Sequence, residues 1–296
     1  MRISDAMIYS QASYNMQTTE QQVQTTSEIA STGIQVTHPW DDPAAAGLAV
    51  VYQSQVASFG ALASATQAAG DELATADTAL DSIGTSLTQA VTLSQEVGSG
   101  VFTAAQQTAT LGQITAIQNE IVAALNTQVG DRYIFGGSID NTPPFSATGA
   151  YSGNTAVRQV EVAPGVFQDA SVRADVAVKG VGGGVDVFAA LNALSTAVSA
   201  NSQAGILTAQ GQLDTALQQV FSARTTEGGN AAAFQTANAV NQTAQTSTSN
   251  NLGTLVDANE TTAASQLAQA QTAMQAAVDA SQKAFQMSLL DVPQTQ

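Results

Sequence analysis

Cysteine is absent from this 296-residue sequence, and histidine occurs once, at His38. The lack of cysteine excludes disulfide frameworks, cysteine-ligated zinc sites and cysteine nucleophiles. Basic residues are also scarce, because 7 Lys and Arg stand against 23 Asp and Glu and give a formal net charge of −16. Between Arg2 and Arg132 there are twelve carboxylates and no basic residue. Binding of nucleic acid or of an anionic membrane surface needs a basic face, so we expect neither as a partner.

Long apolar runs are missing as well. No stretch reaches eighteen consecutive apolar residues, so we expect no membrane-spanning segment. The first residues, Met1 to Asp5, lead into amides instead of the apolar core of a cleavable secretory signal. Only 10% of residues are charged and 5% are aromatic, while Ala, Gln, Thr and Ser are abundant. If the protein leaves the cell, the sequence predicts that it does so without a cleaved signal.

Hydrophobic periodicity is the strongest feature that is present. From Ala45 to Val97, sixteen positions follow one another at spacings of alternately three and four residues. Thirteen of them are apolar, and only Gln55, Thr66 and Ser94 are polar. This pattern predicts one helix about 80 Å long with a coiled-coil-like seam. Asp41 and Asp42 supply an N-cap, Pro43 suits the first helical turn, and Gly98-Ser99-Gly100 is expected to end the helix. The seam comprises Ala45, Leu48, Tyr52, Gln55, Phe59, Leu62, Thr66, Ala69, Leu73, Ala76, Leu80, Ile83, Leu87, Ala90, Ser94 and Val97.

Further helices are predicted on both sides of a central segment. A second helix carries Leu111, Ile114, Ile121 and Leu125, is expected to stop at Gly130, and completes a helical hairpin. Asp186 is a plausible cap for the next helix, and a later helix is expected to break at Gly228-Gly229. The two terminal helices have thin stripes of small residues, so we expect them to be poorly ordered until they pack together. Their stripes are Tyr9, Ala12, Met16, Thr19, Val23, Thr26 and Ala30, and Leu252, Val256, Leu267, Ala270, Met274, Ala277, Val278, Phe285 and Leu289.

The segment from Arg132 to about Val181 has a different pattern. Val172 to Lys179 alternates apolar and polar residues with a period of two, which predicts a strand. Residues 160–162 and 166–167 flank Pro164-Gly165 and predict a hairpin with a type II turn. We therefore expect a small β domain that could be deleted without loss of the helical scaffold.

The predicted fold is mainly α, with long coiled-coil-like helices from both termini packed together and a β insertion in the middle. The sequence divides into five expected parts: an N-terminal assembly helix (1–40), a long helical hairpin (41–131), a β-rich outer domain (132–184), returning helices of a rod domain (185–250) and a C-terminal assembly helix (251–296). Each terminal helix could close its seam within one chain or against neighbouring copies.

Several groups of residues invite a chemical interpretation, and each has a stronger structural one. His38, Asp41 and Asp42 could suggest a metal site, but the adjacent prolines favour a helix cap. Asp71, Glu72, Asp77 and Asp81 could suggest acid–base chemistry, but without a basic partner a solvated helix face is favoured.

Two further groups of residues also have a stronger structural than chemical interpretation. The glycines from Gly180 to Gly184 lack the lysine and hydroxyl of a phosphate-binding loop and are expected to form a linker. The aromatic residues Tyr133, Phe135, Phe145 and Tyr151 could form a carbohydrate platform, but the core of the β segment is favoured. We therefore predict no catalytic, cofactor-binding or metal-binding residue, no cofactor and no enzymatic activity.

Three motifs carry a resemblance to a known family. Residues 31–46 read Ser-Thr-Gly-Ile-Gln-Val-Thr-His-Pro-Trp-Asp-Asp-Pro-Ala-Ala-Ala and resemble the signature near the start of the flagellin superfamily. The opening Met-Arg-Ile-Ser, the block Asp-Arg-Tyr-Ile-Phe-Gly-Gly at 131–137 and Pro-Pro-Phe at 143–145 resemble the FlgL family of that superfamily.

The resemblance implies a structural role outside the cell. Members of the FlgL family join the hook, through hook-associated protein 1, to the flagellin filament, and they assemble with copies of themselves in a ring. They leave the cell through the flagellar type III export apparatus without a cleaved signal, and a chaperone of the FlgN type holds them beforehand. The nearest alternative is a flagellin-type filament subunit. An alternative of another class is a secreted enzyme or adhesin whose activity lies in residues 132–181.

Overall fold

The computed structural model describes residues 2–98 and 103–290 of the chain. Its described residues form seven helices and two small antiparallel sheets. They pack into two units, one drawn from within 1–57 and 245–296 and the other from 58–244. We call these the terminal unit and the central unit. The mainly α fold expected from the sequence is confirmed.

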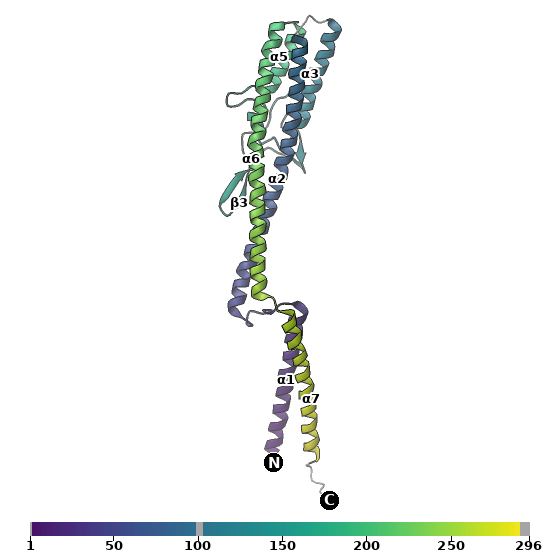
Figure 1. Cartoon of the computed structure of the whole chain (residues 1–296), viewed down its shortest axis with the longest axis vertical. Helices are drawn as coiled ribbons and strands as arrows, with labels where there is room; N and C mark the ends of the chain where they lie inside the picture. The colour runs from purple at the N-terminus through teal and green to yellow at the C-terminus, as the bar shows by residue number, and fades with distance from the viewer. Residues whose placement is uncertain (1, 99–102, 291–296) are drawn as a thin grey trace. The chain divides into compact units, whose positions relative to one another are not determined.

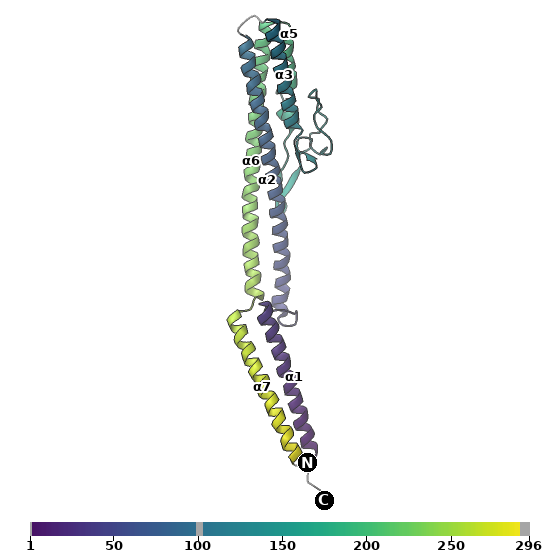
Figure 2. The ribbon, with the colours of Figure 1, turned by 90° about the vertical axis from the view of Figure 1, so that its right-hand side faces the viewer.

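The terminal unit contains α1 (Arg2–Thr32) and α7 (Glu260–Leu290), which lie side by side and run in opposite directions (Figures 1 and 2). Their buried and partly buried residues repeat every three or four positions, as the sequence predicted. Three details of the predicted stripes are wrong: Tyr9 and Ala30 are exposed, Ile29 is partly buried in place of Ala30, and Leu252 and Val256 belong to α6 (Gln203–Val256). The predicted positions Phe285 and Leu289 lie outside the described side chains. A short antiparallel bridge between Ile34 and Asp257 joins the segments next to these helices. The two seams are Ala12, Met16, Thr19, Val23 and Thr26, and Ala263, Leu267, Ala270, Met274, Ala277 and Ser281.

The long helix α2 (Pro43–Gly98) begins where the sequence predicted. Asp42 Oδ1 accepts hydrogen bonds from the backbone N–H groups of Ala44 and Ala45, both at 3.0 Å, so the N-cap is confirmed. α2 ends at Gly98, and Ser99 and Gly100 lie outside the described residues. Every seam position from Thr66 to Val97 is buried, whereas Leu48 near the start of the helix is 50% exposed.

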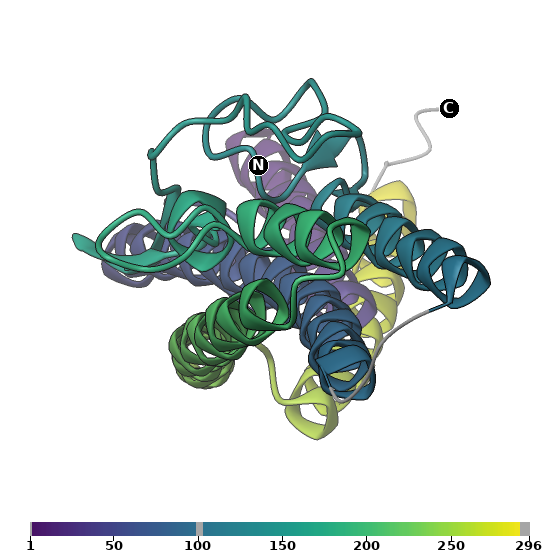
Figure 3. The same ribbon diagram turned by 90° about the horizontal axis from the view of Figure 1, so that it is seen from above.

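The helices α3 (Ala104–Leu125), α5 (Val187–Ser199) and α6 (Gln203–Val256) contribute to the core of the central unit together with α2 (Figures 1 and 3). α3 starts with a capping box formed by Thr103 and Gln106. The predicted cap of α5 is confirmed, because Asp186 accepts from the backbone N–H groups of Phe188 and Ala189.

Two predicted helix ends are wrong. α3 ends at Leu125 and not at Gly130, which instead adopts φ +62° between the two-residue strands β1 (Gln128–Val129) and β2 (Arg132–Tyr133). α6 continues through Gly228 and Gly229 without a break. The helix tolerates both glycines because its packing on α2, for example through Phe234 against Gly70, outweighs their weak helix propensity.

The segment between α3 and α5 contains less strand than expected. The hairpin is confirmed as β3 (Gln159–Ala163) and β4 (Val166–Asp169). The predicted strand at 172–179 is wrong, because residues Ala174–Ala177 form the short helix α4. Ala174, Ala177 and Val178 are buried at the spacing of a helix, and Val176 is exposed. The alternation of apolar and polar residues there therefore did not indicate a strand.

This segment also shares its core with the helices. Phe135, Phe145, Ala170 and Val178 belong to the same cluster of buried residues as Leu80 of α2. Among the described residues, the segment therefore has no core separate from that of the helices. Its deletion without loss of the helical scaffold stays a prediction, and such a deletion would also remove residues of this shared core. The core position favoured from the sequence is confirmed for Phe135, which is 0% exposed, and for Phe145, which is 2% exposed. Tyr151 is partly buried against this core, and Tyr133 is partly buried outside it.

Candidate assembly surfaces

The single histidine takes part in the turn before α2. Asp41 Oδ2 accepts hydrogen bonds from the backbone N–H of His38 at 2.8 Å and from that of Thr37 at 3.2 Å. The bond from His38 is the main reason that the pKa of Asp41 lies below its usual value. The ring of His38 stacks on Trp40 with 4.5 Å between ring centroids. These contacts confirm a turn that leads into the cap at Asp42.

No group of three or more His, Asp or Glu residues that could hold a metal ion occurs in the described part of the chain. Among the same residues, no helix is long and apolar enough to cross a membrane. The glycine segment forms a tight loop before α5, with Gly184 N–H donating to Gly180 O at 2.9 Å. Gly180 has φ +71°, and a Cβ there would lie 2.6 Å from the backbone of Gly184, so the loop requires glycine.

The terminal unit buries little of its apolar surface. Its seam residues on α1 are only partly buried, although Thr19 Oγ1 contacts Met274 Sδ of α7 at 3.5 Å. Large apolar side chains are exposed on α1, on α2 and in the turn between them, a pattern typical of surfaces that contact other chains. They are Met7, Tyr9, Tyr14, Ile34, Trp40, Leu48, Val50 and Val51.

The central unit contains an ion-pair cluster on α2 that the sequence did not reveal. Glu72 is 8% exposed, and its carboxylate binds the guanidinium of Arg158 and lies 3.8 Å from that of Arg132. Arg132 also binds Asp140, and this bond is the main reason that the pKa of Asp140 lies below its usual value. The two arginines thus attach the segment between α3 and α5 to α2.

A second set of ion pairs joins α2 to α6. Arg224 Nε lies 2.9 Å from Asp77 Oδ1, and its Nη1 lies 2.5 Å from Asp81 Oδ1. The bond to Asp77 is the main reason that the pKa of Arg224 is raised. The predicted solvated face is therefore wrong for Glu72, which is buried, and it holds for Asp71 and Asp81, which are exposed. Asp77 is partly exposed, and the expectation that these carboxylates lack a basic partner is wrong for Glu72, Asp77 and Asp81.

The remaining basic residues of the central unit are also paired. Arg173 binds Asp175, and Lys179 binds Asp186 at the cap of α5. All five Lys and Arg residues between 103 and 244 thus have a carboxylate partner within the unit. The charge left for a partner to meet is consequently negative.

The predicted aromatic core is fixed by hydrogen bonds as well as by packing. The ring of Phe145 packs at a tilt against Tyr151, with centroids 4.9 Å apart, and against Phe188 of α5, with centroids 6.1 Å apart. The hydroxyl of Tyr151 donates to Phe135 O at 3.2 Å and contacts Asn154 O at 2.9 Å. Burial raises the pKa of Tyr151 to about 12. The phenylalanines of the Arg-Tyr-Ile-Phe and Pro-Phe motifs, Phe135 and Phe145, therefore share one buried core with Phe188 of α5.

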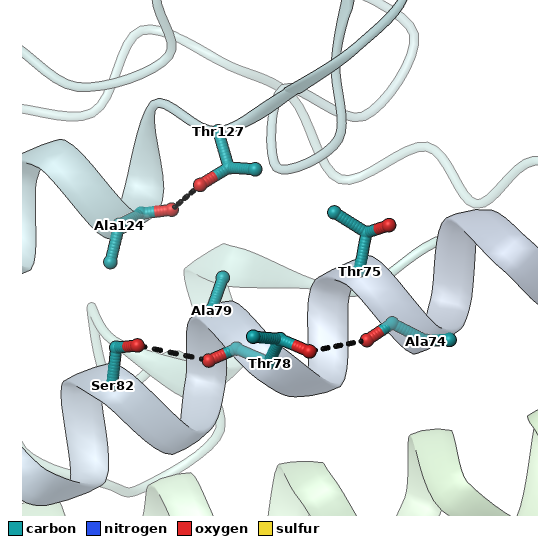
Figure 4. Close-up of a pocket in the computed structure, with 7 residues that line it drawn as sticks. All are labelled: Ala74, Thr75, Thr78, Ala79, Ser82, Ala124 and Thr127. Atoms are coloured by element: carbon teal, nitrogen blue, oxygen red, sulfur yellow. Dashed lines mark hydrogen bonds between the residues drawn. The ribbon is translucent and has the colours of Figure 1, made fainter.

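Two open pockets lie along α2 and α3. The first has a volume of about 490 Å³ and is lined by Ala74, Thr75, Thr78, Ala79, Ser82, Ala124 and Thr127 (Figure 4). The second has about 400 Å³, and its lining includes the carboxylates of Glu96 and Glu120. No charged residue lines the first pocket, so the two differ in the partners that they favour.

Comparison with known proteins agrees with this architecture. Residues 3–140 match the family described as the bacterial flagellin N-terminal helical region. Over 167 residues the chain is 29% identical to flagellar hook-associated protein 3 of Salmonella typhimurium strain LT2, and this match covers 55% of the chain and 53% of that protein. The matched part thus spans about half the length of the curated relative.

Solved structures share the fold. A protein of Vibrio parahaemolyticus assigned to the flagellar hook-associated proteins aligns with a TM-score of 0.67 and 22% identity, over 73% of this chain and 99% of that one. The flagellar junction protein FlgL of Legionella pneumophila aligns with a TM-score of 0.53 and 12% identity, over 63% of this chain and 98% of that one.

The helical architecture and the sequence matches make this chain similar to the flagellin-like proteins of the bacterial flagellum. Within that group, the chain is similar to hook-associated protein 3, in agreement with the resemblance to the FlgL family carried by its motifs.

Proposed function

We propose that this protein forms a ring that joins the hook to the flagellin filament. Support comes from its match to flagellar hook-associated protein 3, from the partly buried seam of α1 and from the exposed apolar side chains of the terminal unit. A pair of helices with such a thin seam gains stability when further helices cover its exposed apolar side chains. We take this uncovered surface as the observation that carries the proposal.

The partners follow from this role. One face of the ring contacts hook-associated protein 1, the other contacts flagellin, and the lateral faces contact further copies of the chain. Before assembly, a chaperone of the FlgN type holds the protein, and the flagellar type III apparatus exports it without a cleaved signal. The protein is therefore located in the extracellular part of the flagellum, and its role is structural and not enzymatic.

Deletion of the gene tests the proposal. Cells without the protein should build hooks, swim poorly or not at all, and release unpolymerised flagellin into the medium. A truncation that removes residues 252–296 should give the same phenotype, because it removes α7 and with it one half of the α1–α7 pair. Normal filaments on cells lacking the protein would contradict the proposal.

A flagellin-type filament subunit is the second candidate, because the flagellin N-terminal helical region matches residues 3–140. The two candidates differ in whether the chain adds to itself without limit. An adaptor has two unlike axial interfaces and stops at a ring, whereas a filament subunit continues. Electron microscopy of concentrated pure protein should show monomers or short rings, and long filaments of this chain alone would favour the second candidate.

A further inference from the structure

The β3–β4 hairpin presents an apolar tip to solvent. Phe167 is 58% exposed and Val166 is 53% exposed, directly after the turn at Gly165. The turn is held by its own contact, since Glu161 Oε1 accepts from the backbone N–H of Gly165 at 2.8 Å. A large aromatic side chain held outward on an ordered hairpin is typical of a contact made with another chain.

The first pocket between α2 and α3 suits an apolar guest. The hydroxyls of Thr75, Thr78, Ser82 and Thr127 each donate to a backbone carbonyl of their own segment, at 2.7 to 3.1 Å. Figure 4 shows three of these bonds, and it shows Ala79 of α2 directed toward the side of Ala124 and Thr127. Because these hydroxyls already have acceptors, an apolar side chain can enter without leaving them unpaired.

Charge distinguishes this pocket from its neighbour. The hairpin contains Glu161 and Asp169 and no basic residue, and Glu161 lies directly opposite Phe167 in the sheet register. Glu96 and Glu120 in the second pocket would repel such a hairpin. The first pocket has no carboxylate in its lining, so this repulsion is absent there.

The hairpin and the pocket lie on different sides of the central unit. Figures 1 and 3 show the hairpin of β3 on one side of α2 and α6, and α3 on the other. A projecting group on one side and a matching recess on another form a heterologous contact, which generates a closed ring when its rotation closes.

We propose that Phe167 of one copy occupies the pocket between α2 and α3 of a second copy and makes the lateral contact between neighbouring subunits. This inference rests on the proposed ring. It adds the two surfaces that meet and the residue that is buried between them.

Cysteine cross-linking tests the contact cleanly, because the natural chain contains no cysteine. Full-length Phe167→Cys and Thr78→Cys proteins are co-expressed in flagellated cells that lack the wild-type copy, and a short bifunctional maleimide is added. A cross-linked dimer should form when both variants are present and not with either one alone. The matched control pairs Thr78→Cys with Leu207→Cys, another apolar position that is 58% exposed, and should give no dimer.

Two substitutions test the same contact without a reagent. Phe167→Ala removes the projecting group, and Thr78→Phe fills the pocket from an exposed position. Each should lower incorporation into flagella at least about tenfold, as expected for loss of a central interface residue, while Leu207→Ala should not. Circular dichroism and urea unfolding verify that each variant is folded.

The position of the protein on the flagellum is measured in the same cells. Absence of the Phe167–Thr78 dimer in cells whose flagella carry the protein at the end of the hook would overturn this contact and leave the junction role intact. An equally strong dimer with the Leu207 control would also overturn it. A specific dimer from a protein spread along the whole filament would support the contact and contradict the junction role.

Discussion

Glu72 and Arg158 are 86 residues apart in sequence and bind each other through a charge-assisted hydrogen bond. Glu72 lies on α2, next to the buried seam residue Leu73, and Arg158 directly precedes β3. Among the described residues, the buried Nε atom of Arg158 has no hydrogen-bond partner, so Glu72 and the carbonyl of Ala170 compensate for desolvation of this guanidinium. The pair of Glu72 and Arg158 fastens the central segment to the longest helix of the protein.

Replacing Glu72 should therefore destabilise the central unit. Glu72→Gln leaves Arg158 without its anionic partner, and we expect the free energy of unfolding to fall by about 2 kcal/mol. Urea unfolding followed by circular dichroism measures this change. Asp81→Asn is the matched control, because its side chain is 62% exposed, and a loss of no more than about 0.5 kcal/mol is expected. Equal losses in the two variants would show that burial of Glu72 is unimportant.

The two glycines inside α6 predict a gain in stability. A Cβ at Gly228 or Gly229 would meet no atom within 4 Å, and both residues are helical. Gly228→Ala and Gly229→Ala should each raise the free energy of unfolding by about 0.5–1 kcal/mol. Gly149→Ala is the contrasting variant, because Gly149 has φ +76° and a Cβ there would lie 2.2 Å from the ring of Phe188. That variant should be less stable than the wild type, and a gain there would refute the packing described for Phe188.

Glu227 predicts a pH-dependent difference in stability. Its burial in α6 raises its pKa, the nearby Asp169 raises it further, and the hydrogen bond from Asn230 opposes the rise. The folded state therefore holds this proton more tightly than the unfolded state, so the contribution of Glu227 to stability falls as pH rises from about 4.5 through the folded pKa. Glu227→Gln keeps an acceptor for Asn230 and removes the buried charge. It should stabilise the protein more at pH 7.5 than at pH 4, measured as a shift of the urea midpoint, and an equal shift at both values would contradict the assignment.

The terminal helices should exchange their amide hydrogens before the central helices do. Seam residues of α1 are only half buried, whereas Leu80, Ile83 and Leu87 of α2 are fully buried. We expect residues 3–30 and 252–290 of the purified monomer to lose protection at a lower free energy of opening than residues 69–97. Native-state hydrogen exchange with mass spectrometry measures both regions in one experiment. Equal protection would show that the pair of terminal helices is stable without neighbours.

Features controlled by local sequence could be predicted well. The seam of α2, the caps at Asp42 and Asp186, and the hairpin around Gly165 each depend on neighbouring residues, and all appear in the structure. The predictions were wrong where tertiary packing overrides the conformational preference of the local sequence. The alternation at 172–179 became a short helix because Ala174 and Ala177 pack into the shared core, and α6 continues through two glycines.

The ion pairs could not be predicted for a related reason. The partners of Glu72 and Asp77 come from residues 60 to 147 positions away, and nothing in a single sequence identifies them. One signal was present, since Glu72 directly precedes the seam residue Leu73 on a helix that is buried on more than one side. A buried carboxylate favours a cationic partner, and Arg132 of the Asp-Arg-Tyr-Ile-Phe-Gly-Gly block lies 3.8 Å from Glu72.

The position of the protein along an intact flagellum tests the central claim most directly. A small tag placed in an exposed loop of the full-length chain can be detected by immunogold electron microscopy on flagella that remain attached to cells. A junction protein should give one cluster of gold particles per flagellum, at the boundary between hook and filament. Labelling along the whole length of the filament would contradict the junction role and identify the chain as a filament subunit.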